Sequence, residues 1–320
     1  MAKKRRDDEL DALSRVFASL DEAPPGLHDV EPPSPNLPAG LPPQLIELYA
    51  HCDGVRLFVD TVEVVPANGV TTPVPGRWRF AEIEGEGISI DVRGKIWRDD
   101  ESLDDAVCDG TRLDRWLSGI VDATALFYDA DGEFAEDAFD EEGEISPEIR
   151  ERSLRAQLKR DPSAPGPRWR LALALLDQAL LEKARDQLEQ VVSDDPAFAW
   201  AWLDLARISE KLGDLSNAAD ELRMAADTAE AMQHPQAGYF FAQMARLAAR
   251  TGDEVGRAQA ASKASLLGTD LKQAQLTGAR ASLEAGDHAS AQGLLELLRA
   301  VWPRDLEVLD LARLVDAATN

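Results

Sequence analysis

Three short stretches of the sequence share one pattern: GDLSNA at residues 213–218, GDEVGRA at 252–258 and GDHASA at 286–291. Each begins with a short-turn pair, Gly-Asp, and each ends on an alanine at a nearly fixed distance from that turn. The second stretch is one residue longer than the other two. Recurrence of one turn and one small residue indicates an internal repeat, which decides the fold of the C-terminal half.

The spacing between these alanines gives the length of the repeat. A fourth unit, without the glycine, is built on Ala184, and the aligned positions are then Ala184, Ala218, Ala258 and Ala291, at spacings of 34, 40 and 33 residues. A period of 34 with helix–turn–helix content is the signature of tetratricopeptide repeats. Residues 165–305 resemble four such repeats, because a helix pair cannot bury its own apolar face and stacks on its neighbours. The third repeat is degenerate, with extra residues near MQHPQAG at 232–238.

The resemblance to tetratricopeptide arrays implies a groove that holds a peptide or a partner helix. The residues that correspond to groove positions are Trp200, Arg207, Gln243, Arg250, Gln273 and Arg280. Three arginines on one face of an acidic protein favour an acidic peptide or a carboxylate ligand. The alternative is that each arginine pairs with a local carboxylate, such as Glu210 or Asp253.

The N-terminal half has a different organisation. We predict a helix at residues 7–20 and a proline-rich, partly disordered linker to residue 36, then an α+β domain over 37–145 with a mainly antiparallel sheet and helices. Its expected strands are 57–65, 78–83 and 87–97, followed by a helix at 111–121 behind a Thr111 cap and a hairpin turning at Asp131-Gly132. A connecting helix at 146–164 leads to the all-α array, and residues 306–320 form a capping helix with its apolar face on Leu306, Leu309, Leu311 and Leu314.

Three motifs of this α+β domain carry a second resemblance. LPPQLIELYAHCDG (41–54) reads as a proline-started helix closed at Asp53-Gly54; ISIDVRGKIW (88–97) is a strand with a turn glycine, and TRLDRWL (111–117) starts a helix. In this order the motifs resemble the SUKH superfamily (SMI/KNR-type domains). The resemblance implies a non-enzymatic, protein-binding domain, in bacteria often an immunity protein that neutralises a toxin.

Charge restricts the partners. The formal net charge of −25 disfavours nucleic acid and favours a basic protein, which under the resemblance is a toxin. We expect the acidic run at 129–144 to contact that partner through Asp131, Glu133, Glu136, Asp137, Asp140 and Glu141. No run of eighteen apolar residues exists, the N-terminal basic cluster is not followed by an apolar stretch, and only two cysteines occur. We therefore expect a cytoplasmic protein without a membrane segment.

Catalytic and metal sites are disfavoured. His51 and Cys52 are adjacent, and consecutive helical side chains point about 100° apart, so they do not make a nucleophile–base pair. An EF-hand beginning at Asp129 would need Gly, an apolar residue and Glu where Phe134, Glu136 and Asp140 stand. Scattered histidines give no zinc motif. We expect no cofactor and no metal.

We therefore predict a protein that is not an enzyme and that binds proteins with two modules. In the main version, the SUKH-like domain binds a protein partner, with toxin immunity as one form, and the repeats bind a second ligand. The alternative is a regulatory scaffold or adaptor that acts mainly through the tetratricopeptide groove. An enzyme of unknown type is a minor alternative.

Overall fold

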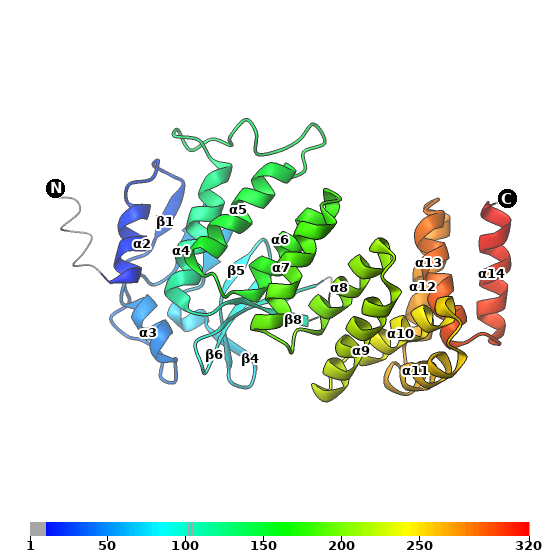
Figure 1. The fold of residues 1–320 in the computed structure, drawn as a ribbon. Coiled ribbons are helices and arrows are strands. Elements are labelled where there is room, and N and C mark those ends of the chain that lie inside the picture. The colour runs from blue at the N-terminus through cyan, green and yellow to red at the C-terminus, as the bar shows by residue number, and fades with distance from the viewer. Residues whose placement is uncertain (1–10, 102, 104, 320) are drawn as a thin grey trace. The chain divides into compact units, whose positions relative to one another are not determined.

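The structure is a computed structural model that describes residues 11–101, 103 and 105–319. The chain divides into two compact units, residues 1–187 and 188–320 (Figure 1). The first unit holds the sheet and the helices as far as the first half of α7, and the second holds the rest of the helical array. Leu10 of the predicted N-terminal helix lies outside the described residues.

An antiparallel sheet organises the first unit. Within the described residues it has eight strands in the order β1-β2-β3-β5-β6-β7-β8, with β4 beside β5. The strands are β1 (His28–Val30), β2 (Val55–Leu57), β3 (Val62–Val64), β4 (Thr71–Val74), β5 (Arg77–Ile83), β6 (Glu86–Asp91), β7 (Ile96–Asp100) and β8 (Asp105–Gly110). Every pairing is antiparallel. The predicted α+β class with an antiparallel sheet is confirmed.

Helices pack beside this sheet. They are α2 (Ala12–Leu20), α3 (Pro43–Tyr49), α4 (Leu113–Thr124), α5 (Pro147–Arg160), α6 (Pro165–Asp177) and the start of α7 (Leu181–Asp194), with short 3₁₀ turns at Ala67–Gly69 and Ala125–Phe127. Helix α4 packs on α2 and α5, α5 packs on α6, and α6 packs on β8 (Figure 1). The core of the unit holds Tyr49, Phe80, Ile90 and Trp116.

Before residue 37 the predicted helix is present as α2, but the predicted linker is part of the folded body. Helix α2 buries Leu13, Val16 and Leu20 in the core. Strand β1 lies inside the proline-rich stretch and pairs with β2, His28 opposite Leu57. Three residues between prolines are too short a run to show a strand pattern, so only pairing with β2 reveals that this part belongs to the folded body.

The strand predicted at 57–65 is a hairpin of two strands, β2 and β3. Its turn contains three consecutive non-glycine residues in the left-handed region, Phe58 (φ 55°), Val59 (φ 53°) and Asp60 (φ 68°). Of the residues that usually mark a turn, this one contains only Asp60 and has no glycine, proline or asparagine. The strands predicted at 78–83 and 87–97 are confirmed, the second as β6 and β7 around a turn at Gly94 (φ 83°). Strand β8 was not predicted.

Two predicted helix boundaries were wrong. Helix α3 ends at Tyr49, so Gly54 (φ 116°) does not close it but lies beside Val64 and Pro66 just before β2. Thr111 does not cap α4; its backbone N and hydroxyl donate to the Asp161 carboxylate at 2.6 and 2.7 Å. In both places the residue contacts a part of the chain outside the helix that it was predicted to close or cap.

Helical hairpins form the array after α6. They are built from α8 (Ala199–Leu212), α9 (Leu215–Ala231), α10 (Ala237–Thr251), α11 (Glu254–Leu267), α12 (Leu271–Glu284), α13 (His288–Val301) and α14 (Leu306–Thr319). At each Gly-Asp turn the glycine is left-handed, with φ of 81°, 77° and 78° at Gly213, Gly252 and Gly286. The aspartate that follows caps the next helix through a backbone N–H three residues on. This geometry confirms the predicted turns and a helical repeat array resembling tetratricopeptide arrays.

The cap residues correct the alignment of the third repeat. Ala184, Ala218 and Ala291 are fully buried, but Ala258 is exposed. Counting four residues from the cap Asp253 places Arg257 at the small-residue position, as Ala218 follows Asp214. The Arg257 side chain donates to the carbonyl of Ala300 on α13 at 2.9 Å. The degenerate repeat therefore has an arginine where its neighbours have alanine.

After the third hairpin (α10 and α11), the helices no longer pack only on their neighbours in the chain. Helix α13 packs on both α10 and α11, while α12 packs on α13 and α14. The last three helices share one core, which includes Leu276, Leu295, Leu298 and Leu311. Helix α14 buries Val308, Leu311, Ala312 and Val315, whereas Leu306, Leu309 and Leu314 of the predicted apolar face are exposed. Two apolar stripes were available, and packing against α12 and α13 buried the one that contains Val308 and Val315.

Candidate partner-binding face of the helical array

Side chains of α8 and α10 form a continuous row within the second unit. Arg207 on α8 donates to the Asp204 carboxylate at 2.8 Å and to the Tyr239 hydroxyl of α10 at 3.3 Å. One turn further along α8, Glu210 accepts from both Arg246 and Arg250 of α10. Helical spacing brings these residues onto one side of each helix. We call this row, from Trp200 to Arg250, the α8–α10 face.

The charges of the α8–α10 face are partly buried. The carboxylates of Asp204 and Glu210 are 6% and 8% exposed, while the Arg207 and Arg250 side chains are 47% and 45% exposed. Burial opposes the charge of Arg207, but Asp204 and Tyr239 outweigh it, so its pKa is raised. Arg246 is the third arginine of this face. Three arginines therefore pair with two carboxylates, and the face has a surplus of positive charge although the formal net charge of the chain is −25.

An aromatic cluster lies at one end of this face. The Trp200 ring lies 4.8 Å from Phe240 and 6.1 Å from both Tyr239 and His234, centroid to centroid. Trp200 is 8% exposed, and its indole Nε1 has no hydrogen-bond partner among the described residues. A buried donor without an acceptor costs about 1–3 kcal/mol.

The predicted groove residues are brought together only in part. Trp200, Arg207, Gln243 and Arg250 all belong to α8 and α10, and Gln243 is 9% exposed with its amide oxygen accepting from Arg246 at 2.8 Å. Gln273 and Arg280 are exposed on α12, which packs on α13 and α14. Two of the three groove arginines pair with local carboxylates, as the alternative expected: Arg250 with Glu210 and Arg207 with Asp204. Binding by these six residues stays a prediction.

The acidic run forms two successive hairpins in the first unit. Tyr128 pairs with Phe134 and Phe139 with Ile145, and left-handed glycines, Gly132 and Gly143, stand in the turns. The turn predicted at Asp131-Gly132 is present, and the second hairpin was missed. Asp129 Oδ1 accepts from the backbone of residues 131 and 133, and Asp140 Oδ1 accepts from 142 and 144.

Of the six acidic-loop residues predicted to contact a partner, two make structural side-chain contacts among the described residues and four do not. Asp140 holds a turn, and Asp137 meets Arg152 at 3.4 Å. The remaining four are exposed on the hairpins, and no ion pair of theirs occurs within the part of the chain that the structure describes: Asp131, Glu133, Glu136 and Glu141. Contact of this loop with a partner stays a prediction.

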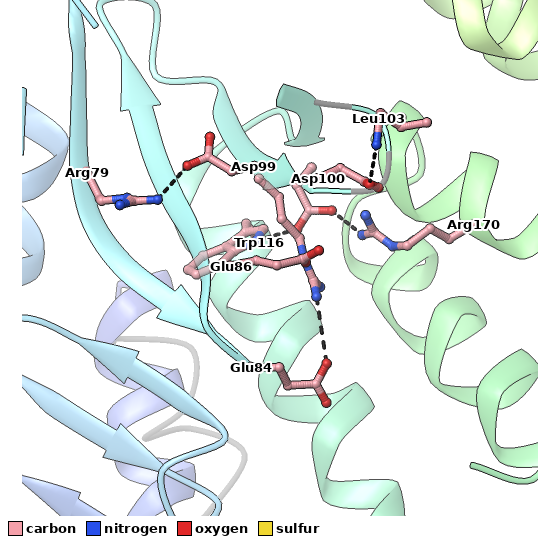
Figure 2. Close-up of polar contacts among 10 residues, drawn as sticks. Arg79, Glu84, Glu86, Asp99, Asp100, Leu103, Trp116 and Arg170 are labelled. Carbon is pink, nitrogen blue, oxygen red and sulfur yellow. Dashed lines mark hydrogen bonds and ion pairs between the residues drawn. The ribbon is translucent and has the colours of Figure 1, made fainter. Parts of the chain in front are cut away.

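A buried polar network joins the sheet to the first repeat helix. The carboxylate of Asp109 on β8 is fully buried and accepts from Arg170 on α6 and from Trp116 Nε1 at 2.9 Å (Figure 2). Arg98 adds a second nearby cation and pairs with Glu86 and Glu84. Burial alone would raise the pKa of Asp109, but Arg170 and Arg98 lower it below its usual value. The network therefore holds an ionised carboxylate.

No local sequence signal marks this network. Asp109 lies in DAVCDG, a strand too short and too polar to show a clear alternation, and Arg170 lies in the first half of α6. The close approach of Gly166 on α6 to the strand also gave no signal: a Cβ there would lie 2.9 Å from the Cys108 carbonyl oxygen. Pairing of these residues is set by packing of α6 on β8.

His51 and Cys52 do not form a reactive pair. The Cys52 side chain is fully buried and its thiol faces the carbonyl of Leu48 at 3.8 Å. His51 stacks on Phe17 at 5.3 Å and lies 3.9 Å from Asp11. Burial raises the pKa of the Cys52 thiol to about 11. This thiol is a core group.

Comparisons with known proteins identify no family. No family model matches the chain, and no curated protein matches it. Among solved structures, PilF of Pseudomonas aeruginosa is similar at 18% identity and a TM-score of 0.35, over 52% of this chain and 74% of that one. MamA from Desulfovibrio magneticus RS-1 (20%, 0.34, 52% and 86%) and YrrB, described as a TPR protein with an unusual peptide-binding site (15%, 0.33, 52% and 84%), are similar too. These likenesses are too weak for properties of those proteins to be carried over.

In the described residues, no group of three or more His, Cys, Asp or Glu side chains is arranged to hold a metal ion. Among the same residues, no helix is both long and apolar enough to cross a membrane.

Proposed function

We propose that this chain is a non-enzymatic protein-binding scaffold, and that the α8–α10 face binds an acidic peptide or the acidic face of a partner helix. The observation that carries this proposal is the pair of half-exposed guanidinium groups, Arg207 and Arg250, held in place by buried carboxylates. A guanidinium presents five N–H donors, so one that already bonds a buried carboxylate retains donors for a second one.

The aromatic cluster adds a different kind of contact. Trp200 and Tyr239 adjoin the arginine row through the bond between Arg207 and the Tyr239 hydroxyl. Aromatic and arginine side chains are the residue types that contribute most to protein interfaces. A peptide bound here would place a carboxylate on the arginines and an apolar group near the aromatic rings. Gln273 and Arg280 on α12 would extend the contact only for a longer ligand.

The proposal is tested by comparing two charge-reversed chains. The first carries Arg207→Glu and Arg250→Glu, and the control carries Arg299→Glu and Arg313→Glu, which reverse exposed arginines elsewhere in the same unit. Tagged chains capture proteins from source-cell lysate, and each candidate's acidic segment is then titrated as a synthetic peptide. We expect loss of at least tenfold in affinity for the first variant only. Equal binding by both variants would refute the assignment of this face.

A second candidate function concerns the sheet unit. Neutralisation of a basic toxin is what the SUKH resemblance implies, and one observation favours it: the acidic hairpins present four carboxylates that hold no turn. Co-expression with a neighbouring toxin gene tests it, with protection and a complex as the expected result. A cytoplasmic location remains part of the same proposal.

A further inference from the structure

A cavity of about 630 Å³ lies in the first unit, between the sheet, α4, α5, α6 and the two acidic hairpins. Cavities of this size, about 300–1,000 Å³, are typical of ligand sites. Its wall is largely apolar and draws on every one of these elements: Ile83, Ile120, Phe134, Phe139, Leu154 and Leu173. The cavity therefore offers a hydrophobic interior beside the acidic hairpins and within a different unit from the α8–α10 face.

The charged groups that line this cavity already have partners. Arg170 is bound to the buried Asp109, and Arg98 is bound to Glu86 and lies 3.8 Å from Glu84. Arg150 lies 4.0 Å from Asp177. A small anion would have to compete with each of these carboxylates. The faces of the guanidinium groups, however, can still contact an aromatic ring, which favours cations of this kind.

Two aromatic side chains stand exposed at the cavity. Phe134 is 60% exposed and Phe139 is 37% exposed, and their rings meet edge to face at 5.1 Å. Phe134 also stacks on Tyr128 at 5.1 Å. Because Asp129 and Asp140 fix the two turns, these rings are carried by ordered hairpins. Exposed aromatic rings beside an apolar cavity are the arrangement expected where a partner's aromatic group inserts.

The charge around this cavity selects the partner. Residues 127–146 contain nine Asp and Glu, and the sequence has no Lys or Arg between Arg115 and Arg150. The negative field of the hairpins attracts a cationic chain and repels an anionic one. A second copy of this protein, at −25, would be repelled as well.

We infer that this cavity binds an aromatic side chain from a basic segment of a partner protein, with the ring in the cavity against Phe134 and Phe139 and flanking lysines or arginines against the hairpin carboxylates. The inference deepens the proposed protein-binding function, because it adds a second site of opposite charge preference to the α8–α10 face. The chain would then bind an acidic segment in one unit and a basic, aromatic segment in the other.

The test uses the full chain and a short fluorescein-labelled peptide with one phenylalanine flanked by lysines. Fluorescence anisotropy measures its affinity at low and at high salt. A matched peptide with alanine in place of phenylalanine isolates the contribution of the ring. We expect about a tenfold or greater loss for the alanine peptide at both salt concentrations, since truncating an anchor in a pocket has that effect. Equal affinity of the two peptides would overturn the inference.

Variants of the chain distinguish binding in the cavity from non-specific electrostatic attraction of the basic peptide to acidic side chains. Phe134→Ser with Phe139→Ser should weaken the phenylalanine peptide about tenfold and leave the alanine peptide unchanged. Asp131→Asn, Glu133→Gln and Glu141→Gln should weaken both peptides and flatten their salt dependence, because these carboxylates hold no turn. Asp227→Asn, Glu284→Gln and Glu296→Gln remove three exposed charges from the second unit as the control.

Outcomes for the two sites are distinguishable. Arg207→Glu with Arg250→Glu should leave the basic peptide's affinity unchanged, even if the α8–α10 face binds nothing. If the control charge variant weakens the peptide as much as the hairpin variant, binding is non-specific and the inference is wrong. If the phenylalanine variants bind the phenylalanine peptide normally, the cavity is not the site. Circular dichroism of each variant confirms that the fold is retained.

Discussion

Asp109 and Arg170, 61 residues apart, form an ion pair whose carboxylate is completely buried and whose guanidinium is 21% exposed. The first residue belongs to the last strand of the sheet and the second to the first helix of the repeat array. This pair, with Trp116 as a third partner, makes the sheet and helix α6 parts of one structural unit (Figure 2).

Removing the buried carboxylate should destabilise the first unit. Asp109→Ala leaves Arg170 without its counter-ion, and breaking a buried pair costs about 3–5 kcal/mol. Urea unfolding followed by tryptophan fluorescence should show this loss in the unit that contains Trp116. Asp310→Ala, which removes an exposed pair with Arg313, should change stability by less than about 1 kcal/mol. Similar small effects for both variants would contradict the structural role of Asp109.

The sheet should not fold stably without the first repeat helix. A fragment of residues 1–162 contains every strand but lacks Arg170 and the Gly166 contact with β8. A fragment of residues 1–195 retains both and includes all of α7. We expect cooperative thermal unfolding, measured by circular dichroism, only for the longer fragment. Equal melting temperatures would show that the sheet is an independent domain.

Mild acid should weaken the fold through His28. Burial lowers the pKa of His28, and its Nδ1 accepts from the Phe58 backbone N–H at 3.3 Å. The unfolded chain takes up a proton near about pH 6.5, before the folded one does. The contribution of neutral His28 is therefore present above that pH and is lost as the pH falls below it. Urea midpoints at about pH 8 and pH 5 should differ less for His28→Asn than for the unmodified chain.

Both cysteines should be unreactive in the folded protein. Cys52 and Cys108 are both buried, and burial raises the pKa of the Cys52 thiol to about 11. Little thiolate forms near neutral pH, and reagents have no access. Mass spectrometry after iodoacetamide treatment should find both labelled only in denaturant. Ala50→Cys places a thiol at an exposed position of the same segment and should be labelled without denaturant. Rapid labelling of Cys52 in the native chain would contradict this assignment.

Relieving the left-handed turn should stabilise the first unit. Val59 is β-branched, has φ of 53° and is 69% exposed, so its side chain gains little from burial. A β-branched residue is costly in this region, whereas glycine is not. We expect Val59→Gly to raise the free energy of unfolding by about 0.5–1 kcal/mol. Val92→Gly, also 69% exposed but without a positive φ, should lower it by a similar amount.

The sequence by itself determined the elements whose signals are local. Gly-Asp turns, a period of 34 residues and alanine- and leucine-rich helices were sufficient for the repeat array, and alternating apolar residues for β5, β6 and β7. Such signals depend on a few neighbouring residues, namely a glycine free to be left-handed, an aspartate that caps, and a periodic apolar face.

Only the tertiary structure decided the pairings between distant residues. Four features depend on which distant segments pack together: strand β8, the Asp109–Arg170 pair, the contact of Arg257 with Ala300, and the cavity lined by Phe134 and Phe139. A buried carboxylate and a surface carboxylate are the same letter in the sequence. What separates them is desolvation and the nearness of a counter-ion, and both arise only when the chain has packed.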